Sequence, residues 1–330
     1  MTANFDEILK ALRQYSEEEL ISIFNAAIEN VKSESKTVSK CDCPYCSGRQ
    51  VILYGKKHGK QRFLCKECSH TFITTTHTMM SKSHYGEDIW HEMFLDTIAG
   101  NALSFSEKRL GISHQAAFNM RHKILIAMQD VFSDNPTTLG DVCELDETYV
   151  LDCYKGKKLP ETFTRGPRKH GAKAGKRGIS NEYVCLCTGV QRKGDVIVAA
   201  ANRAKPSMEE LASVFDGHIE DGSLFLTDGL RRCRVLESMA DCTVKNVEKE
   251  SASFYHLNTV NNLHSYIKRQ YDFYRGVATK YINRYNVLFA VAYRKTAEAL
   301  GKLSSLLFRV GQTSYTHTLR DIRSLRLLLI

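Results

Sequence analysis

Long apolar runs are missing from this sequence of 330 residues. The best candidates, Val196–Ala201 and Val287–Tyr293, are far shorter than the ~18 residues that a membrane-spanning helix needs. The N-terminus lacks a basic start followed by an apolar stretch, so we do not expect a secretory signal. Five prolines predict few rigid linkers, and there is no internal repeat or low-complexity tract. We therefore expect a globular chain without a membrane partner.

Basic residues exceed acidic ones. The chain has 46 Lys and Arg against 37 Asp and Glu, giving a net charge of +9. This excess favours a polyanionic partner such as nucleic acid, although many basic proteins bind none. Eleven cysteines without a secretory signal indicate a reducing compartment, so we expect a cytoplasmic protein. With a DNA partner, it would be associated with the nucleoid.

Composition and apolar spacing divide the chain into several regions. Residues 140–300 are predicted to contain three strands, then alternating helices and strands, then helices, which is typical of a mixed α/β domain. The expected regions are an N-terminal helical hairpin (1–35), a cysteine-rich ribbon (41–75), a helical domain (85–132), the α/β core (140–300) and a C-terminal helical tail (301–330).

Four cysteines have the spacing of a structural zinc site. Cys43, Cys46, Cys65 and Cys68 form C-x2-C pairs separated by eighteen residues. Each pair can place two thiolates on one tetrahedral ion, and two pairs close the site without an open position. A pair of redox dithiols is the alternative, but a thioredoxin-type site needs only one such motif. We predict a zinc ribbon.

Residues 85–132 have the pattern of a helix-turn-helix. A helix ending at Leu110 is followed by a Gly-Ile-Ser turn and a helix from His114, whose first residues would contact base edges. A simple three-helix bundle gives a similar pattern. The candidate DNA-contacting residues on the second helix are Gln115, Asn119, Arg121 and Lys123.

Two aspartates interrupt or end apolar strands. Asp146 lies in Glu-Leu-Asp-Glu-Thr-Tyr, and Asp228 follows Leu-Phe-Leu-Thr. Aspartates at strand ends often only cap the next element. Two on adjacent strands, however, can share Mg²⁺ ions that bind the attacking and leaving oxygens in phosphoryl transfer. A third ligand would then come from a helix packed beside them.

The ordered set of motifs resembles a known family. The ribbon, E-L-D-E-T-Y-V, L-T-D-G and H-x-N-T-V-N-N-L-H-S-x-x-K are similar to insertion-sequence transposases of the zinc-ribbon type related to Merlin elements, the ISXO-like group. The resemblance runs to about Asn286. It implies an RNase H-like core with a D-D-E or D-D-N triad: Asp146, Asp228 and Asn261 as ligands of catalytic Mg²⁺ or Mn²⁺. It also implies that Lys268, seven residues after Asn261 and on the same helix face, contacts the DNA end.

Asn261 departs from the glutamate that most relatives have at the third position. Its amide oxygen is neutral and therefore a poorer metal ligand. A D-D-N subgroup exists among ISXO-like elements, so we interpret Asn261 as native, with an inactivated copy as the alternative. Glu144 and Glu147 flank Asp146, and we expect both to point away from it on an alternating strand.

A basic insertion is expected at 155–178. Between Lys155 and Arg177 there are nine Lys or Arg and a single acid. An ordinary solvated loop is the alternative, but this charge density favours contacts with the DNA backbone, which position DNA without reading its sequence. The candidate residues are Arg168, Lys169 and Lys173.

The leading hypothesis is a DNA transposase. It would bind the terminal inverted repeats of its element as a homo-oligomer, cleave one strand with metal-activated water and join the freed 3′-hydroxyl to target DNA. No nucleotide is required, and the sequence has no G-x-x-x-x-G-K-[ST] loop. The alternative is a non-enzymatic DNA-binding regulator derived from an inactivated transposase. A weaker alternative is a structural scaffold in a larger DNA complex.

Overall fold

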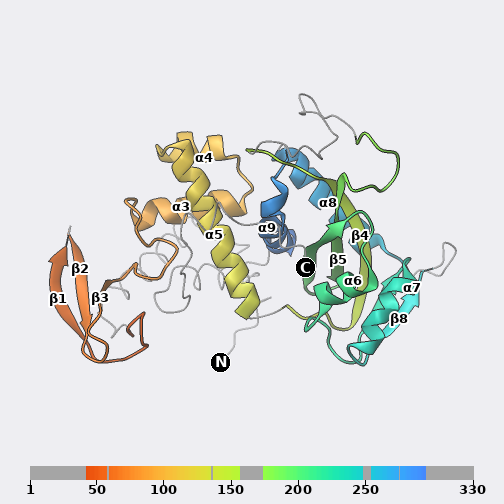
Figure 1. Cartoon of the computed structure of the whole chain (residues 1–330), viewed down its shortest axis with the longest axis horizontal. Helices are drawn as coiled ribbons and strands as arrows, with labels where there is room; N and C mark the ends of the chain where they lie inside the picture. Colours follow the sequence, from red (N-terminus) through yellow and green to blue (C-terminus); the bar gives the residue numbers. More distant parts are fainter. Residues whose placement is uncertain are drawn as a thin grey trace, which may run out of the picture. The chain divides into compact units, whose positions relative to one another are not determined.

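The computed structural model describes residues 42–57, 59–134, 137–156, 174–247, 254–274 and 276–294 (Figure 1). The predicted hairpin (1–35), the tail (301–330) and the basic residues Arg168, Lys169 and Lys173 lie outside these ranges. The chain divides into two compact units between Thr74 and Thr75. Among the described helices, none is both long enough and apolar enough to span a membrane.

The first unit is a three-stranded antiparallel sheet. Its strands are β1 (Val51–Lys57), β2 (Lys60–Cys65) and β3 (Thr71–Ile73), in the order β1-β2-β3. The buried core contains Phe63 and Phe72, whose rings stack 5.5 Å apart, and two cysteines. Almost all of β1 is exposed. A core of this size cannot stabilise a sheet alone. This unit therefore needs a further source of stability.

The second unit is built on a mixed five-stranded sheet. Strands β4 (Val142–Leu151), β5 (Tyr183–Gln191) and β6 (Val196–Arg203) form an antiparallel meander, whereas β7 (Leu224–Thr227) and β8 (Thr243–Asn246) run parallel to β4. The order is β6-β5-β4-β7-β8. This arrangement confirms the mixed α/β class that the sequence predicts.

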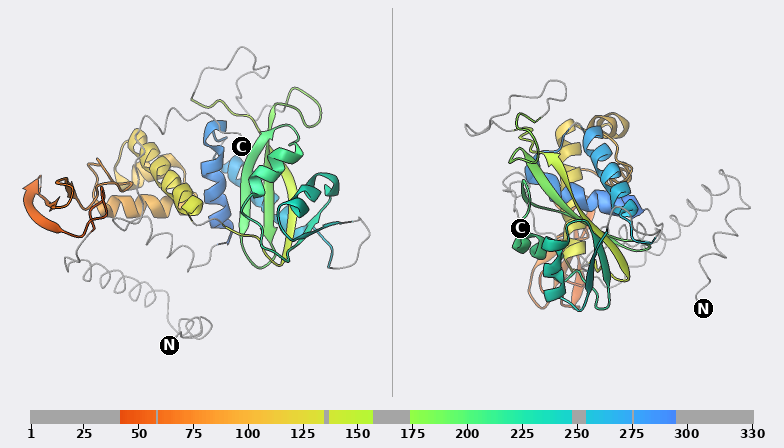
Figure 2. Two further views of the ribbon diagram at one scale, coloured as in Figure 1. Left: turned by 60° about the horizontal axis from the view of Figure 1, so that its bottom comes forward. Right: turned by 90° about the vertical axis from the view of Figure 1, so that its right-hand side faces the viewer.

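Helices cover both faces of this sheet (Figure 2). On one face lie α6 (Met208–Phe215), α7 (Leu230–Cys233) and the 3₁₀ turn Arg234–Ser238; on the other lie α8 (Asn258–Phe273) and α9 (Ile282–Arg294). The sequence predicts one helix over 230–239, but the structure has a short α-helix followed by the 3₁₀ turn.

The interior strand β5 is buried on both faces, which explains its run of small and apolar residues. Val184 and Leu186 face the α8 and α9 side, whereas Cys185 and Cys187 face the other core. Gly189 permits a close approach on that second side. A Cβ atom there would lie 2.6 Å from a methyl carbon of Leu139 and 2.8 Å from the Phe215 ring. Any larger residue would force this core apart.

Three helices precede the sheet: α3 (Glu87–Ile98), α4 (Leu103–Leu110) and α5 (His114–Asp134). Gly111 ends α4 in the left-handed conformation, with φ of 62°, and thereby forms the tight turn into α5. Trp90 and Ile124 belong to the same buried cluster as Val198 and Phe289. The three helices and the α8–α9 face of the sheet therefore share one core.

Candidate active site

Asp146 and Asp228 lie at matching positions on two adjacent strands of the sheet. Leu145 of β4 pairs with Thr227 of the parallel neighbour β7, and each aspartate is the next residue. Burial and the nearby charge of Asp228 raise the pKa of Asp146 to about 6, against a smaller lowering effect of a hydrogen bond from the Glu147 N–H. A carboxylate whose ionised form is disfavoured in this way, with a second carboxylate nearby, forms a place where a cation is stabilising.

One face of α8 lies against Asp146. His264 Nδ1 is 3.6 Å from Asp146 Oδ2. Asn261 precedes His264 by three residues and Lys268 follows it by four, so all three share one helix face. Burial and the charge of Lys268 lower the pKa of His264 to about 4, and Lys268 also acts to lower that of Asp146. The structure therefore places the helix face of Asn261 and Lys268 on the side of Asp146.

His264 was not among the predicted site residues. It is 6% exposed, and a lone histidine on an amphipathic helix is typical of a satisfied core residue. Its spacing in the sequence, three residues after Asn261 and four before Lys268, could have predicted that it lies on the same helix face as these two residues. Its Nε2 lies 2.7 Å from the Thr188 hydroxyl of β5, and that hydroxyl donates to the backbone oxygen of Asp146 at 2.6 Å.

Glu144 fixes the start of α8. Its fully buried carboxylate accepts hydrogen bonds from the backbone N–H groups of Thr259 and Val260 at 2.8 and 3.0 Å, and from the Thr259 hydroxyl. Arg192 donates to the same carboxylate at 2.8 Å. A negative charge at a helix N-terminus is stabilising. Glu144 thus joins β4 to the first turn of the helix that bears Asn261, through the two residues that precede it.

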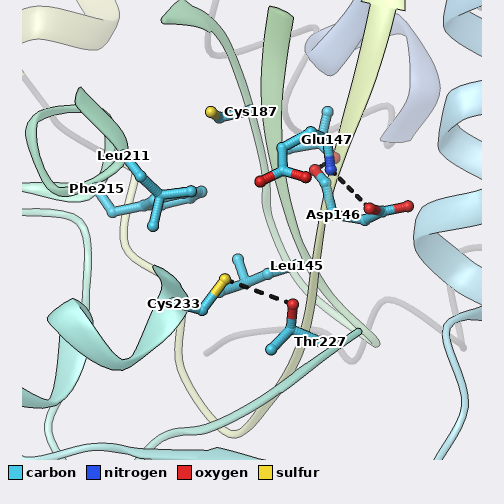
Figure 3. A pocket seen from close by; sticks show the side chains of 9 residues that line it. Leu145, Asp146, Glu147, Cys187, Leu211, Phe215, Thr227 and Cys233 are labelled. Carbon is cyan, nitrogen blue, oxygen red and sulfur yellow. Dashed lines mark hydrogen bonds between the residues drawn. The ribbon is translucent and has the colours of Figure 1, made fainter. Parts of the chain in front are cut away.

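The placement of Glu144 corrects the expectation that it points away from Asp146. The two residues are two positions apart, so they share a face of the strand, and both contact α8. Glu147 does point the other way, as Figure 3 shows, and it accepts a hydrogen bond from Arg232 at 2.8 Å. Glu144 caps a helix, so neither glutamate is placed to substitute for a metal ligand.

A small, largely apolar pocket lies behind Asp146 (Figure 3). Most of its lining comes from the α6–α7 side of the sheet, including Cys187, Phe215 and Cys233. The carboxylate of Asp146 points away from these side chains. The pocket is therefore part of the core on that side, and the candidate site opens on the α8 side.

We expect Glu144→Ala to reduce the free energy of unfolding by about 3 kcal/mol or more, because it leaves the Arg192 guanidinium without its buried partner and uncaps α8. Glu144→Gln should cost less, since its amide oxygen still accepts a hydrogen bond. Chemical denaturation measures both. The exposed pair Glu92–Arg109 is the matched control, and Glu92→Ala should cost no more than about 1 kcal/mol. Equal losses for both alanine variants would contradict the capping role.

The four ribbon cysteines come together. Their sulfur atoms all lie within 4.8 Å of one another, with 3.5 Å between Cys43 and Cys68 and 3.6 Å between Cys46 and Cys65. Thiolates about 2.3 Å from one tetrahedral zinc ion are about 3.8 Å apart, so the geometry fits. Both knuckles have the same backbone form. Ser47 and Ser69, one residue past each pair, have φ of 58° and 59°.

The predicted DNA-contacting residues of α5 differ in exposure. Gln115 is exposed and donates to the Asn119 side chain at 2.9 Å. Lys123 donates to the backbone oxygens of Met79 and Ser81, which ties α5 to the preceding segment. Arg121 is 1% exposed and donates to the backbone oxygen of Asn101 at 2.6 Å. This burial corrects the prediction for Arg121, whose guanidinium cannot reach a base edge.

Comparison with known proteins finds a matching family model and a similar protein. Residues 138–296 match the family model for the ISXO2-like transposase domain. A protein of Halobacterium salinarum, described as an uncharacterized protein in transposable element ISH50, is 24% identical over 272 residues, covering 78% of this chain and 88% of that protein.

Solved structures of Mos1 transposase are also similar. A paired-end complex with the left transposon end is 13% identical, covers 67% of this chain and 78% of the Mos1 chain, and has a TM-score of 0.25. A Mos1 mariner paired-end complex with Mn is 12% identical, covers 68% and 79%, and has a TM-score of 0.26.

Proposed function

We propose that the protein is a DNA transposase that binds the terminal inverted repeats of its element and catalyses metal-dependent strand cleavage and strand transfer, on the premise that residues 138–296 match the family model for the ISXO2-like transposase domain. We further propose that it acts as a homo-oligomer on double-stranded DNA, in the cytoplasm and associated with the nucleoid. The net charge of +9 supports a DNA partner.

One observation supports the chemistry above all: Asp146 and Asp228 follow paired residues of adjacent parallel strands, and the α8 face that bears Asn261 and Lys268 lies against Asp146. The sheet order is also the one expected of an RNase H-like core, with three antiparallel strands followed by two parallel ones. Glu144 supports the arrangement, because it holds the start of α8 against the strand that bears Asp146.

In this proposal Asp146, Asp228 and Asn261 would hold two Mg²⁺ or Mn²⁺ ions. Their oxygen donors suit these hard cations. When bound, such ions activate an attacking oxygen and stabilise the leaving oxygen of a phosphodiester. Lys268, exposed on the same face, is positioned to pair with a DNA phosphate near the site.

The overall reaction has two steps. Water attacks the phosphorus at the element end, the bond to the 3′-oxygen breaks, and that oxygen leaves as a hydroxyl. The 3′-hydroxyl then attacks a target phosphodiester, so one phosphoester bond forms as another breaks and no nucleotide is consumed. The four ribbon cysteines would hold a structural zinc ion, and the ribbon and α5, through Gln115 and Asn119, would contact the element ends.

A non-enzymatic DNA-binding regulator is the second candidate function. It is favoured by the neutral amide of Asn261 where an acidic ligand is usual. Cleavage of a labelled inverted-repeat end by the purified, zinc-loaded protein in Mg²⁺ or Mn²⁺ separates the two. The transposase is expected to cleave at the element boundary. Specific binding without cleavage in either metal, with the correct ends, would favour the regulator.

We expect Asn261→Ala to reduce cleavage by at least about tenfold, because one metal loses an oxygen ligand. Asn262→Ala is the matched control. Asn262 accepts a hydrogen bond from the Tyr293 hydroxyl at 3.0 Å on α9, so it is turned away from Asn261. Its replacement should change cleavage by no more than a few-fold. If the two variants cleave equally well, Asn261 is not a ligand.

A further inference from the structure

The hydrogen bonds around His264 fix which of its ring nitrogens bears a proton. The Thr188 hydroxyl has a single hydrogen, and it lies 2.6 Å from the backbone oxygen of Asp146, which can only accept. That hydrogen is therefore used. His264 Nε2, 2.7 Å from the same hydroxyl, must then be the donor, and the hydroxyl oxygen accepts from it. The proton of a neutral His264 thus sits on Nε2.

Nδ1 then presents a bare lone pair to Asp146. It lies 3.6 Å from Asp146 Oδ2, beyond hydrogen-bonding distance. The lone pair and the carboxylate oxygen face each other in a partly buried place, so they repel unless a cation or a donated hydrogen lies between them. Adjacent ligands of an octahedral ion, each about 2.1 Å from the metal, are about 3 Å apart. The observed separation is slightly wider, and a small movement of either side chain closes it.

We propose that His264 Nδ1 is a nitrogen ligand of the divalent ion held by Asp146, with Thr188 orienting the ring. This assignment rests on the proposed function, which places a divalent ion at Asp146. Within the described residues, the donor atoms of Asp146, Asp228 and His264 do not all lie within 4.8 Å of one another, so the assignment concerns the Asp146–His264 pair.

A nitrogen ligand changes which metal the site prefers. Carboxylate and amide oxygens suit Mg²⁺ and Mn²⁺, whereas imidazole favours transition metals. The site is therefore expected to bind Mn²⁺ more tightly than Mg²⁺. The neutral ligand set of His264 and Asn261 also leaves Asp146 and Asp228 as the negatively charged ligands, which makes their charges the main source of affinity.

The test uses Mn²⁺ as a spectroscopic probe in the zinc-loaded, full-length protein. Pulsed electron paramagnetic resonance of bound Mn²⁺ is expected to show coupling to one directly bound ¹⁴N nucleus, replaced by a ¹⁵N signal when histidine is labelled. His264→Gln keeps an amide donor near Thr188 but lacks Nδ1, so it should lose this coupling and bind Mn²⁺ at least about tenfold more weakly. Thr188→Val should keep the coupling and weaken binding by about tenfold, as other orienting partners do.

His256 provides the control. It is the histidine beside the Glu144–Arg192 pair, and His256→Gln should retain the nitrogen coupling of the parent. Mn²⁺ bound in the parent and lost in Asp146→Asn, but without ¹⁴N coupling, would overturn the role of His264 and leave the proposed function intact. This outcome is read from the parent spectrum, so it does not depend on the folding of any His264 variant. Failure to find Mn²⁺ binding that depends on Asp146 would instead overturn the proposed function.

Discussion

Asp146→Asn and Asp228→Asn are each expected to reduce strand cleavage by about 1000-fold or more, while binding to element-end DNA stays within a few-fold of the parent. Each change removes one negative charge from the site proposed to hold the metal. Metal stabilisation of a phosphoryl-transfer transition state is worth several kcal/mol, and each 1.36 kcal/mol is tenfold in rate. Binding is proposed to rest on other residues, so it should survive.

The same substitution should not destabilise the fold. In the metal-free protein, burial and the charge of Asp228 raise the pKa of Asp146 to about 6, so the ionised carboxylate is disfavoured there. Asparagine has the same shape and no charge. The melting temperature of metal-free Asp146→Asn should therefore equal or exceed that of the parent, which separates loss of chemistry from loss of structure.

Glu147→Gln is the matched control for the cleavage assay. Glu147 is the next residue on the same strand, but it points to the opposite face and pairs with Arg232. Cleavage by this variant should stay within a few-fold of the parent. Parent-level cleavage by the Asp146→Asn, Asp228→Asn double variant would refute the assignment of the site.

Local sequence patterns predict the strands of the sheet well. Apolar runs bounded by polar residues are visible without tertiary information, and a strand such as Leu224–Thr227 that is followed by Asp-Gly places its aspartate at the carboxyl end of the strand. The parallel pairing of β4 and β7, which sets Asp146 beside Asp228, follows from the family resemblance rather than from periodicity.

Residues whose role depends on distant partners could not be predicted in this way. Arg121 looks like an exposed basic residue on a recognition helix, yet it is buried against Asn101 and near the Tyr274 ring, more than 150 residues later. His264 resembles a core histidine until Thr188 of β5 fixes its tautomer. Glu144 becomes a helix cap only because α8 begins beside it. Each of these contacts forms only when segments that are distant in the sequence pack together.

Cys65→Ser is expected to remove the zinc ion and unfold the ribbon over residues 42–73. The ribbon core consists of Cys43, Cys65 and the Phe63–Phe72 pair, with little other buried surface. Burial of two phenylalanines supplies only about 3 to 6 kcal/mol. Metal binding by zinc-finger peptides contributes about 10 to 16 kcal/mol, so the ion would be the main source of stability.

Metal analysis and hydrogen exchange measure the two effects in one sample. Zinc content should fall from one ion per chain towards zero, and amides of β1, β2 and β3 should lose protection while β5 and β6 keep theirs, because the two units have separate cores. Cys242→Ser, a half-buried cysteine outside the ribbon, is the control and should retain zinc. Full zinc retention after replacement of all four ribbon cysteines would show that the ion binds elsewhere. The ribbon would then need another explanation for how so small a core stays folded.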